Sequence, residues 1–278
     1  RIDLSLRCLL LDDGENRVLI ESGMGDKLTS KFAKMFHVLQ PDHPLKERLG
    51  EIGYKMEDIT HMILTHLHFD HVCDLSDFAI LSFNNRRPKK LKVYGPEGTE
   101  RFMELGIRQA YQQDIQSRIR SGKSPASMDW DVKEINESGV VTEGDDFIIS
   151  SLQTAHGGLP NFNYRFDVGN LRIVITSDTE PDDALVDFSE SADLLVCECS
   201  GTKQFLETQG WGTWHMNPQS VADLASRSGA KQVVLKHLVI ENFSDDADVS
   251  EKMAEEIRQD IKGEVQVGYD GLRIVFHS

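Results

Sequence analysis

The sequence predicts an α/β protein of the αββα sandwich type, in which two mixed β-sheets pack face to face with helices outside. Short apolar runs with the length of strands recur along the chain, and amphipathic runs with helical spacing lie between them. Elements of these two kinds bury their apolar faces by packing in layers. Because no break in composition divides the 278 residues, we expect a single domain over residues 1–278. The start at Arg1 leaves open a further strand upstream.

The expected elements alternate along the chain. Strands are expected at residues 5–12, 17–21, 62–64, 91–94, 132–135, 147–154, 162–168, 171–176, 194–199, 233–236, 265–269 and 272–276. Helices are expected at residues 26–40, 44–52, 75–83, 99–120, 181–190, 218–228 and 250–261. Turn residues at 13–16, 169–170 and 270–271 predict three hairpins. The helix at 99–120 is expected to be continuous and to end at Gly122 and Pro125.

A strand followed by four metal-ligand side chains is expected at residues 60–71, which read THMILTHLHFDH. His66 and His68 are two residues apart, and Asp70 and His71 come next. A tight loop at the strand end can point two imidazoles at one cation and the Asp–His pair at a second. Imidazole and carboxylate favour Zn²⁺, Mn²⁺ or Fe, and the lack of cysteine among the four disfavours a closed structural zinc site.

Three further strand ends present residues of the same type. His156 follows the strand at 147–154, Asp178 follows 171–176, and His237 follows 233–236. Chance can place one histidine after a strand, but it rarely places this whole series in order. The pattern therefore predicts a site for two metal ions. Two cations that share a water molecule lower its pKa and polarise the substrate oxygen.

The run from His66 to His71, HLHFDH, resembles the H-x-H-x-D-H signature of the metallo-β-lactamase superfamily of hydrolases. This resemblance implies the superfamily fold and a complete ligand set. His66, His68 and His156 would bind the first metal, Asp70, His71 and His237 the second, and Asp178 would bridge them. It also implies two divalent ions, Zn²⁺ by default with Mn²⁺ or Fe as alternatives, and attack on the substrate by a metal-bridging hydroxide.

Three further stretches resemble the ribonuclease Z and arylsulfatase-like phosphodiesterase branch. Residues 93–99 are similar to a V-x-G-P-x-G-T stretch of that branch, and His156 lies in a TAHG sequence followed by Tyr164-Arg165-Phe166. Glu198, in CEC, and His215, in WHMNP, match the pair that ribonuclease Z places beside its metals. The resemblance implies hydrolysis of a phosphodiester or related small ester. His215 with Glu198 would protonate the leaving oxygen, and Asp70 would act as ligand and proton acceptor.

Two alternative functions remain open. The GMGD start at residues 23–26 and the LHFDH run also resemble quorum-quenching lactonases, which gives a lactonase or thioesterase as the second hypothesis. The third is an iron-binding redox protein or a metal-binding protein without turnover. Diiron oxygen reducers of this fold usually carry Glu at the position of His68, which counts against the redox version.

The charge balance bears on partners and location. The chain has 46 acidic and 30 basic residues, and its formal net charge of -16 disfavours nucleic acid and anionic membranes. Residues 118–123, with three basic side chains, are the one modest basic segment. A small-molecule ester is thus the expected partner, and a homodimer is left open.

The four cysteines show no C-x-x-C or disulfide spacing, which favours the cytoplasm. No apolar run reaches the length of a membrane span.

Several other residues have two interpretations. Glu21 stands where the superfamily usually has Asp, which puts its supporting role in doubt. Glu198 could point outward between two core cysteines, Cys197 and Cys199, neither of which is an expected nucleophile. Trp211 and Trp214 could be core or substrate contacts. The remaining histidines are expected to be structural or on the surface, and they are His37, His43, His61 and His277.

Overall fold

The computed structural model describes residues 3–5, 8–23, 45–180, 182–240, 246–269 and 271–276. These residues form two compact units whose segments alternate along the chain. Unit 1 contains residues 3–5 and the described part of 137–269, and unit 2 contains the rest. The expected helix at 26–40, which includes Asp26 and His37, lies outside the described residues, as do Met24, His43 and His277.

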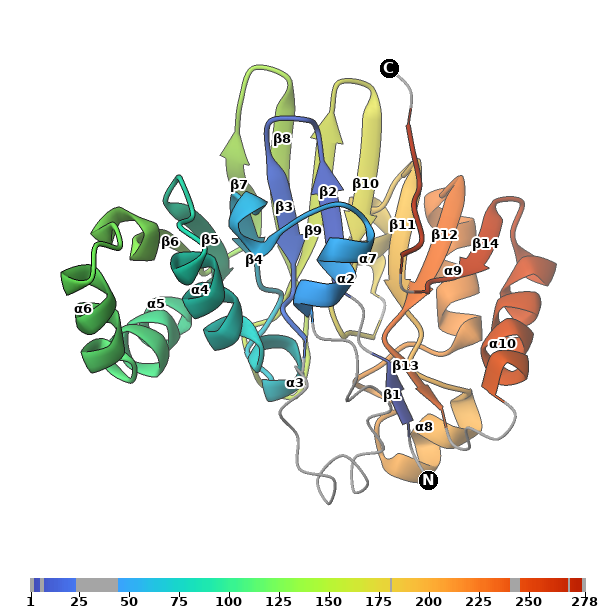
Figure 1. Ribbon diagram of the computed structural model, residues 1–278. Coiled ribbons are helices and arrows are strands. Elements are labelled where there is room, and N and C mark those ends of the chain that lie inside the picture. Colours follow the sequence, from blue (N-terminus) through green and yellow to red (C-terminus); the bar gives the residue numbers. More distant parts are fainter. Residues whose placement is uncertain are drawn as a thin grey trace. The chain divides into compact units, whose positions relative to one another are not determined.

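Unit 2 is built on a five-stranded sheet with the order β2-β3-β4-β5-β6 (Figure 1). Its strands are β2 (Leu9–Asp12), β3 (Arg17–Ile20), β4 (His61–Ile63), β5 (Leu91–Pro96) and β6 (Trp130–Ile135). β2 and β3 form the expected hairpin, because the Asp13 carboxylate accepts hydrogen bonds from the backbone N–H groups of Glu15 and Asn16. The other neighbouring strands are parallel. Loops that follow β3, β4 and β5 therefore leave the same edge.

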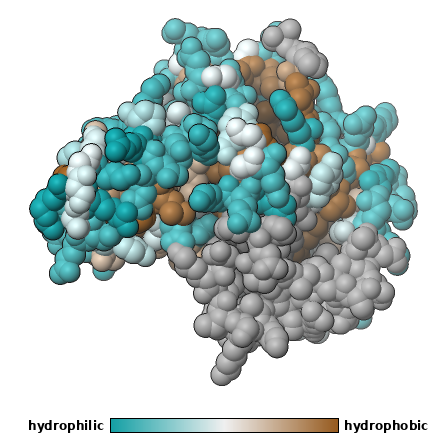
Figure 2. Space-filling model, in the orientation of Figure 1, coloured by the Kyte–Doolittle hydropathy of each residue, from teal (hydrophilic) through white to brown (hydrophobic). Residues whose placement is uncertain are grey.

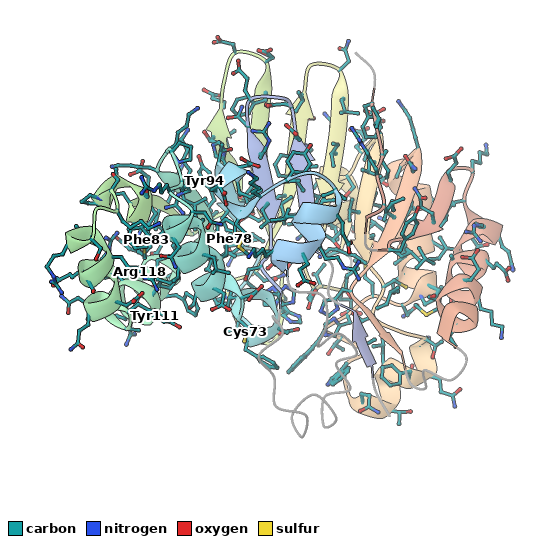
Figure 3. All side chains as sticks on the ribbon, viewed as in Figure 1. Cys73, Phe78, Phe83, Tyr94, Tyr111 and Arg118 are labelled. Carbon is teal, nitrogen blue, oxygen red and sulfur yellow. The ribbon has the colours of Figure 1, made fainter. Side chains whose placement is uncertain are left out.

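Helices of unit 2 supply much of its core. They are α2 (Leu45–Glu51), α3 (Phe69–Val72), α4 (Leu75–Asn84), α5 (Thr99–Arg101) and α6 (Gln112–Arg120), with short 3₁₀ turns at Met56–Asp58 and Pro125–Met128. Phe78 and Phe83 on α4, labelled in Figure 3, have no exposed area and pack with Met62 and Leu64 of the β4 region. The apolar face of α4 thus covers β4, the strand that leads into the histidine loop.

The expected helix at residues 99–120 is confirmed in its bounds, but it is not one regular α-helix. Wide π-type turns occupy Phe102–Gln109 between α5 and α6, and Tyr111 interrupts the helix with φ of -103°. Met103 and Ile115 both belong to the core cluster of unit 2. In a regular α-helix these two residues would point about 120° apart, given 3.6 residues per turn. Wider turns rotate less per residue and bring both side chains to the buried side.

Unit 1 is built on a seven-stranded sheet with the order β14-β12-β11-β10-β9-β8-β7. Its strands are β7 (Gly139–Glu143), β8 (Phe147–Gln153), β9 (Phe162–Val168), β10 (Leu171–Ile175), β11 (Leu194–Glu198), β12 (Gln232–Lys236) and β14 (Glu264–Val267). From β7 to β10 the pairing is antiparallel, and from β10 to β14 it is parallel. The predicted α/β class with two mixed sheets and flanking helices is confirmed. The single-domain expectation stays a prediction.

The helices of unit 1 are α7 (Asp183–Phe188), α8 (Lys203–Gln209), α9 (Pro218–Ser228) and α10 (Asp246–Asp260). α9 has the expected bounds, because the Asn217 side chain accepts from two backbone N–H groups at its start and Gly229 ends it with φ of 69°. β7, α8 and β13 (Leu238–Ile240) were not expected.

Two expected strand arrangements are wrong. The run at 5–12 is not one strand, because β1 (Asp3–Ser5) pairs with β13 while β2 pairs with β3. The closing hairpin at 265–276 is also wrong, since β14 pairs with β12 and residues 272–276 form no strand. Val275 is 54% exposed, so this alternating segment does not bury an apolar face. The pairing of β14 with β12 takes the place of the hairpin that the Asp270-Gly271 sequence predicts.

The outer surface agrees with the charged composition. In Figure 2 the part of unit 2 around α6 is covered mainly by hydrophilic residues. Among the described residues, no helix is both long and apolar enough to cross a membrane.

His61, at the start of β4, gives a pH-dependence that can be tested. Burial, and then the charge of Lys92, lower its pKa from 6.5 to about 4. The unfolded chain binds a proton near the ordinary pKa while folded His61 remains neutral, so His61 removes folding stability as the pH falls from 6.5 towards 4. We expect His61→Asn to lose less unfolding free energy than the parent over this interval, measured by urea denaturation at several pH values.

Asn is the suitable replacement because of the hydrogen bonds around His61. Thr60 Oγ1 donates to the carbonyl of Arg17, so it accepts from the Nδ1–H of His61 at 2.7 Å. An amide N–H can take over this bond. Parallel pH profiles for parent and variant would contradict the assignment.

Candidate active site

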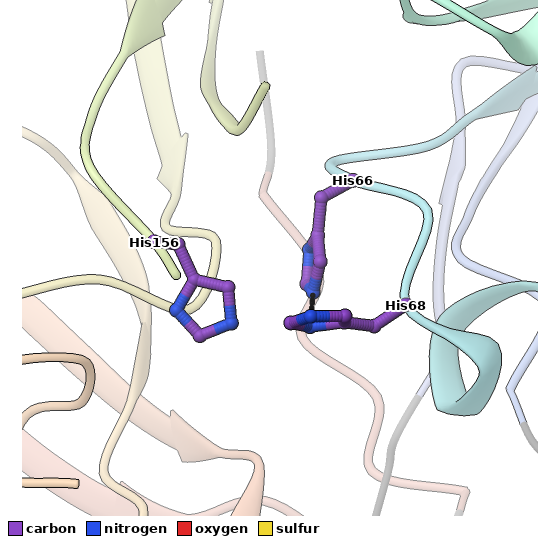
Figure 4. Close-up of side chains that lie close together, drawn as sticks. All are labelled: His66, His68 and His156. Atoms are coloured by element: carbon purple, nitrogen blue, oxygen red, sulfur yellow. Dashed lines mark hydrogen bonds between the residues drawn. The ribbon is translucent and has the colours of Figure 1, made fainter. Parts of the chain in front are cut away.

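The loop after β4 holds the paired histidines of unit 2. The backbone N–H of Leu64 still bonds to β5, at the carbonyl of Tyr94, and the chain then leaves the sheet. His66 is fully buried, with Nδ1 3.0 Å from Thr65 Oγ1. Its Nε2 lies 3.0 Å from Nδ1 of His68, as the dashed line in Figure 4 shows. The sequence spacing thus brings the two imidazoles together as expected.

His71 and Asp70 lie on α3, immediately after these two histidines. The ring of His71 is 4.0 Å from that of His66, centroid to centroid, and its Nε2 is 3.6 Å from Asp70 Oδ2. The backbone N–H of His71 donates to the carbonyl of His68, which closes the loop. The four ligand-type residues of the HLHFDH run therefore form one group within unit 2.

Glu21 supports this loop, which resolves the doubt raised by its replacement of Asp. The residue is buried at the end of β3, with a left-handed φ of 67°. Its Oε1 accepts from the backbone N–H of Thr65 at 2.9 Å, and its Oε2 lies 3.3 Å from Nδ1 of His71. A carboxylate at this position favours a proton on Nδ1 and leaves Nε2 of His71 for other contacts.

The strand directions of unit 1 place the other predicted residues at one edge of its sheet. β10, β11 and β12 are parallel, and β8 runs in the same direction because two antiparallel pairings separate it from β10. His156, Asp178, Glu198 and His237 lie at or just beyond the C-terminal ends of these strands. All four are at least 95% buried.

Four ligand-type side chains meet at this edge. One nitrogen or oxygen atom from each of Asp178, Glu198, His215 and His237 lies within 4.8 Å of the others. The closest approach is between Asp178 Oδ2 and His237 Nε2, which are 3.1 Å apart. His237 adopts a left-handed φ of 53° between β12 and β13. This backbone conformation turns the imidazole towards Asp178.

Glu198 is fully buried and bonded on both carboxylate oxygens. Its Oε1 accepts from the backbone N–H groups of Thr179 at 2.7 Å and Met216 at 3.2 Å. Its Oε2 lies 3.3 Å from Nδ1 of His215. The interpretation of Glu198 as an outward strand residue is therefore wrong. The predicted Glu–His pair is present, and His215 keeps 12% of its side-chain area exposed.

Ser200 joins these groups, although the sequence did not single it out. Its buried hydroxyl lies 2.5 Å from Glu198 Oε2, 3.1 Å from His215 Nδ1 and 2.9 Å from His237 Nδ1. A hydroxyl has one proton, which goes to the carboxylate, so Ser200 accepts from both imidazoles. This arrangement puts a proton on each Nδ1 and leaves each Nε2 to act as a ligand or to transfer a proton.

His156 is held in the same way. Its Nδ1–H donates to the backbone carbonyl of Trp214 at 3.1 Å, which leaves Nε2 as the ligand atom. Asn161 is fully buried, and its side-chain amide donates to Thr154 Oγ1 and to the backbone carbonyl of Asp178, both at 3.0 Å. The amide of Asn161 thus ties the end of β8 to the loop after β10.

Cys197 and Cys199 are not placed for nucleophilic chemistry. Both thiols are fully buried in the core of unit 1. Burial raises the pKa of each thiol above its ordinary value, which is opposite to the shift that activates a cysteine. The expectation that neither is a nucleophile agrees with these surroundings.

The donor set fits divalent transition metals. Imidazole nitrogens and carboxylate oxygens dominate both groups of side chains, which suits zinc, manganese or iron. Within unit 1, Ser200 leaves the lone pair of His237 Nε2 facing Asp178 Oδ2 at 3.1 Å. Two acceptors at this distance repel one another unless a cation or a proton lies between them. The residues present therefore fit a metal.

Mixed sheets with buried histidines and a buried aspartate at their strand ends are typical of a metallo-hydrolase. A family model described as "Beta-lactamase superfamily domain" matches residues 16–238, so the chain belongs to the beta-lactamase superfamily. The predicted family resemblance and the prediction of a metal-dependent hydrolase are confirmed.

Known sequences and structures agree with this assignment. The chain is 27% identical over 220 residues to "Probable metallo-hydrolase YhfI" of Bacillus subtilis, covering 77% of this chain and 78% of that protein. It is 26% identical over 209 residues to ribonuclease Z of Mycobacterium bovis, covering 69% of this chain and 72% of that protein. The crystal structure of YhfI aligns with a TM-score of 0.65 at 21% identity, covering 96% of this chain and 90% of that one. The crystal structure of human tRNase Z, short form, aligns with a TM-score of 0.67 at 18% identity, covering 96% of this chain and 91% of that one.

The Ser200 hydroxyl gives a direct test of this geometry. Ser200→Ala removes the acceptor shared by His215 and His237, and Ser200→Thr retains it. Loss of such an outer partner lowers metal affinity about 10–100-fold, so we expect this loss of Zn²⁺ affinity for the Ala variant and near-parent affinity for Thr. Competition with a chromophoric chelator measures the affinity.

The matched control is Ser228→Ala. Ser228 is buried in the last turn of α9, where its hydroxyl donates to the carbonyl of Ala225. Equal Zn²⁺ affinities for the Ser200→Ala and Ser228→Ala proteins would refute the role given to Ser200.

Proposed function

We propose that the chain is a dinuclear metal-dependent hydrolase that cleaves a phosphodiester or a related small ester. The observation that carries this proposal is the buried group formed by Asp178, Glu198, His215 and His237. It combines ligand-type side chains with a Glu–His pair, and structural ligands alone would not need that pair. Membership of the beta-lactamase superfamily supports the same conclusion.

The seven side chains that the sequence predicts are the proposed ligands. We assign His66, His68 and His156 to one metal and Asp70, His71 and His237 to the other, with Asp178 as the bridging ligand. Two divalent ions, Zn²⁺ by default, would supply Lewis acidity and an activated water. The neutral imidazoles keep the net positive charge of such a pair high. Glu21, Ser200 and the carbonyl of Trp214 orient the rings of His71, His237 and His156.

His215 is the proposed general acid. Glu198 and Ser200 hold its Nδ1–H, so Nε2 is the atom that delivers a proton to the leaving oxygen. The Glu198 carboxylate stabilises the protonated imidazole at 3.3 Å. Asp70 is the proposed acceptor for the proton of the attacking water, in addition to its role as ligand.

The net charge and the related proteins support the proposed substrate class. The net charge of -16 favours a small ester over a long polyanion. The related proteins include a ribonuclease Z and, by fold, a diphosphatase of the PhnP family. The lactonase reading rests partly on Met24 and Asp26, which lie outside the described residues.

Two variants distinguish the role of a metal ligand from the role of the general acid. We expect His68→Ala to abolish both hydrolysis of bis(4-nitrophenyl) phosphate and full metal loading, because it removes a ligand. We expect His215→Ala to keep two metals and to lower kcat about 10²–10⁴-fold, the range for loss of a general acid. Steady-state rates and elemental analysis of the same preparations give the two readouts.

His61→Asn is the control, because His61 bonds to Thr60 and not to the candidate site. Parent-level turnover by His215→Ala would rule out its role as acid. Faster turnover of an acyl-homoserine lactone than of the phosphodiester would replace the proposed substrate class. Iron instead of zinc after native purification, together with no turnover of either ester, would favour the redox alternative.

A further inference from the structure

The two tryptophans that precede His215 have different surroundings. Trp211 is partly buried and packs against Phe205, Leu206 and Val239, a small apolar cluster. Trp214 leaves 42% of its area exposed. The sequence left core and substrate contact as equal alternatives for both. Trp211 therefore packs in the apolar cluster, with its ring 6.1 Å from that of His215, and the role of Trp214 needs a separate explanation.

The backbone holds the Trp214 indole beside the candidate site. The carbonyl of Trp214 accepts the Nδ1–H of His156, and the next residue is His215. The indole lies edge-on to the His156 ring, with 6.1 Å between centroids and 73° between planes. The exposed indole is therefore fixed at the rim of the residues proposed to bind metal and to donate a proton.

The chain next to the indole lacks side chains. Gly157 and Gly158 follow His156 with left-handed φ values of 56° and 81°. A Cβ atom on Gly157 would lie 3.5 to 3.8 Å from three carbons of the Trp214 six-membered ring, and a Cβ on Gly158 would meet nothing within 4 Å. The nearest following side chain, Leu159, is itself 37% exposed. Two glycines thus leave the aromatic surface open.

We infer that Trp214 binds a planar aromatic ring attached to the phosphoryl group of the substrate, by stacking on its indole. An aryl group and a nucleobase share this chemistry. An exposed indole offers a large rigid surface, and stacking on it tolerates many rings because each has a π-face. This inference rests on the proposed function, since it names the substrate class of the same site.

Binding of stable phosphoryl compounds tests the inference without turnover. The probes are phenylphosphonate against methylphosphonate, and thymidine 5′-monophosphate against ribose 5-phosphate, titrated calorimetrically into zinc-loaded protein. We expect the parent to bind at least one aromatic probe about tenfold more tightly than its non-aromatic match, as aromatic stacking implies. The pair that shows the preference distinguishes an aryl group from a nucleobase.

Variants of Trp214 complete the experiment. Trp214→Leu should remove the preference, while Trp214→Phe should retain most of it. Gly157→Ala should reduce it, because its methyl group would cover part of the indole. Tyr111→Leu is the control, since Tyr111 is a similarly exposed aromatic residue (39%) in unit 2.

The outcomes separate this inference from the function it rests on. An unchanged preference in Trp214→Leu, or no preference in the parent, overturns the stacking role even if bis(4-nitrophenyl) phosphate is hydrolysed. Failure of the parent to hydrolyse any phosphodiester refutes the proposed function, and the binding titrations still decide whether Trp214 selects an aromatic ring.

Discussion

The candidate site of unit 1 depends on one constraint, the common direction of four strands. Parallel strands deliver their C-terminal ends to the same edge of a sheet, and ligands of open α/β sheets bind at such edges. β8, β10, β11 and β12 all end at this edge, and His156, Asp178, Glu198 and His237 lie at or just beyond these ends. Reversal of any one strand would carry its side chain to the opposite edge. The β9 strand, which runs the other way, supplies none of these residues.

Hydrogen bonds between buried polar groups then fix the loops at this edge. Glu198, Asn161 and Ser200 have no exposed area, and an unsatisfied buried polar group costs about 1–3 kcal/mol. Each of the three bonds to segments from different strand ends. Moving one loop would therefore break bonds in its neighbours as well. The same bonds place a proton on Nδ1 of His215 and His237, so one network sets both position and tautomer.

Features with local causes could be predicted from the sequence. The bounds of α9 follow from Asn217 and Gly229, and the HLHFDH run brings His66, His68 and His71 together because the residues are adjacent. Features set by distant partners could not be predicted. Ser200 has no local signal, since its role depends on imidazoles 15 and 37 residues away.

Pairing between distant segments explains the wrong elements. β14 takes a parallel partner, β12, in preference to the segment beyond its own turn. β13 exists because β1 pairs with it, and neither run is long enough to indicate a strand alone. In the 99–120 segment, the common core of Met103 and Ile115 selected wider turns over regular helix. Glu21 replaced the expected residue yet kept a carboxylate in reach of His71, which the sequence pattern alone did not indicate.

The left-handed backbone at Glu21 and His237 connects the site with the stability of the fold. A non-glycine residue in this conformation costs on the order of 1–3 kcal/mol, and glycine would avoid most of that cost. Glycine would also remove the carboxylate beside His71 or the imidazole beside Asp178. Glycine would also remove the acceptor of the buried Thr65 N–H at position 21, or the hydrogen bond to Ser200 at position 237, so the lost hydrogen bonds offset the relief of backbone strain. A substitution at either position therefore acts on the fold and on the proposed metal ligands together, and thermal stability and activity are coupled there.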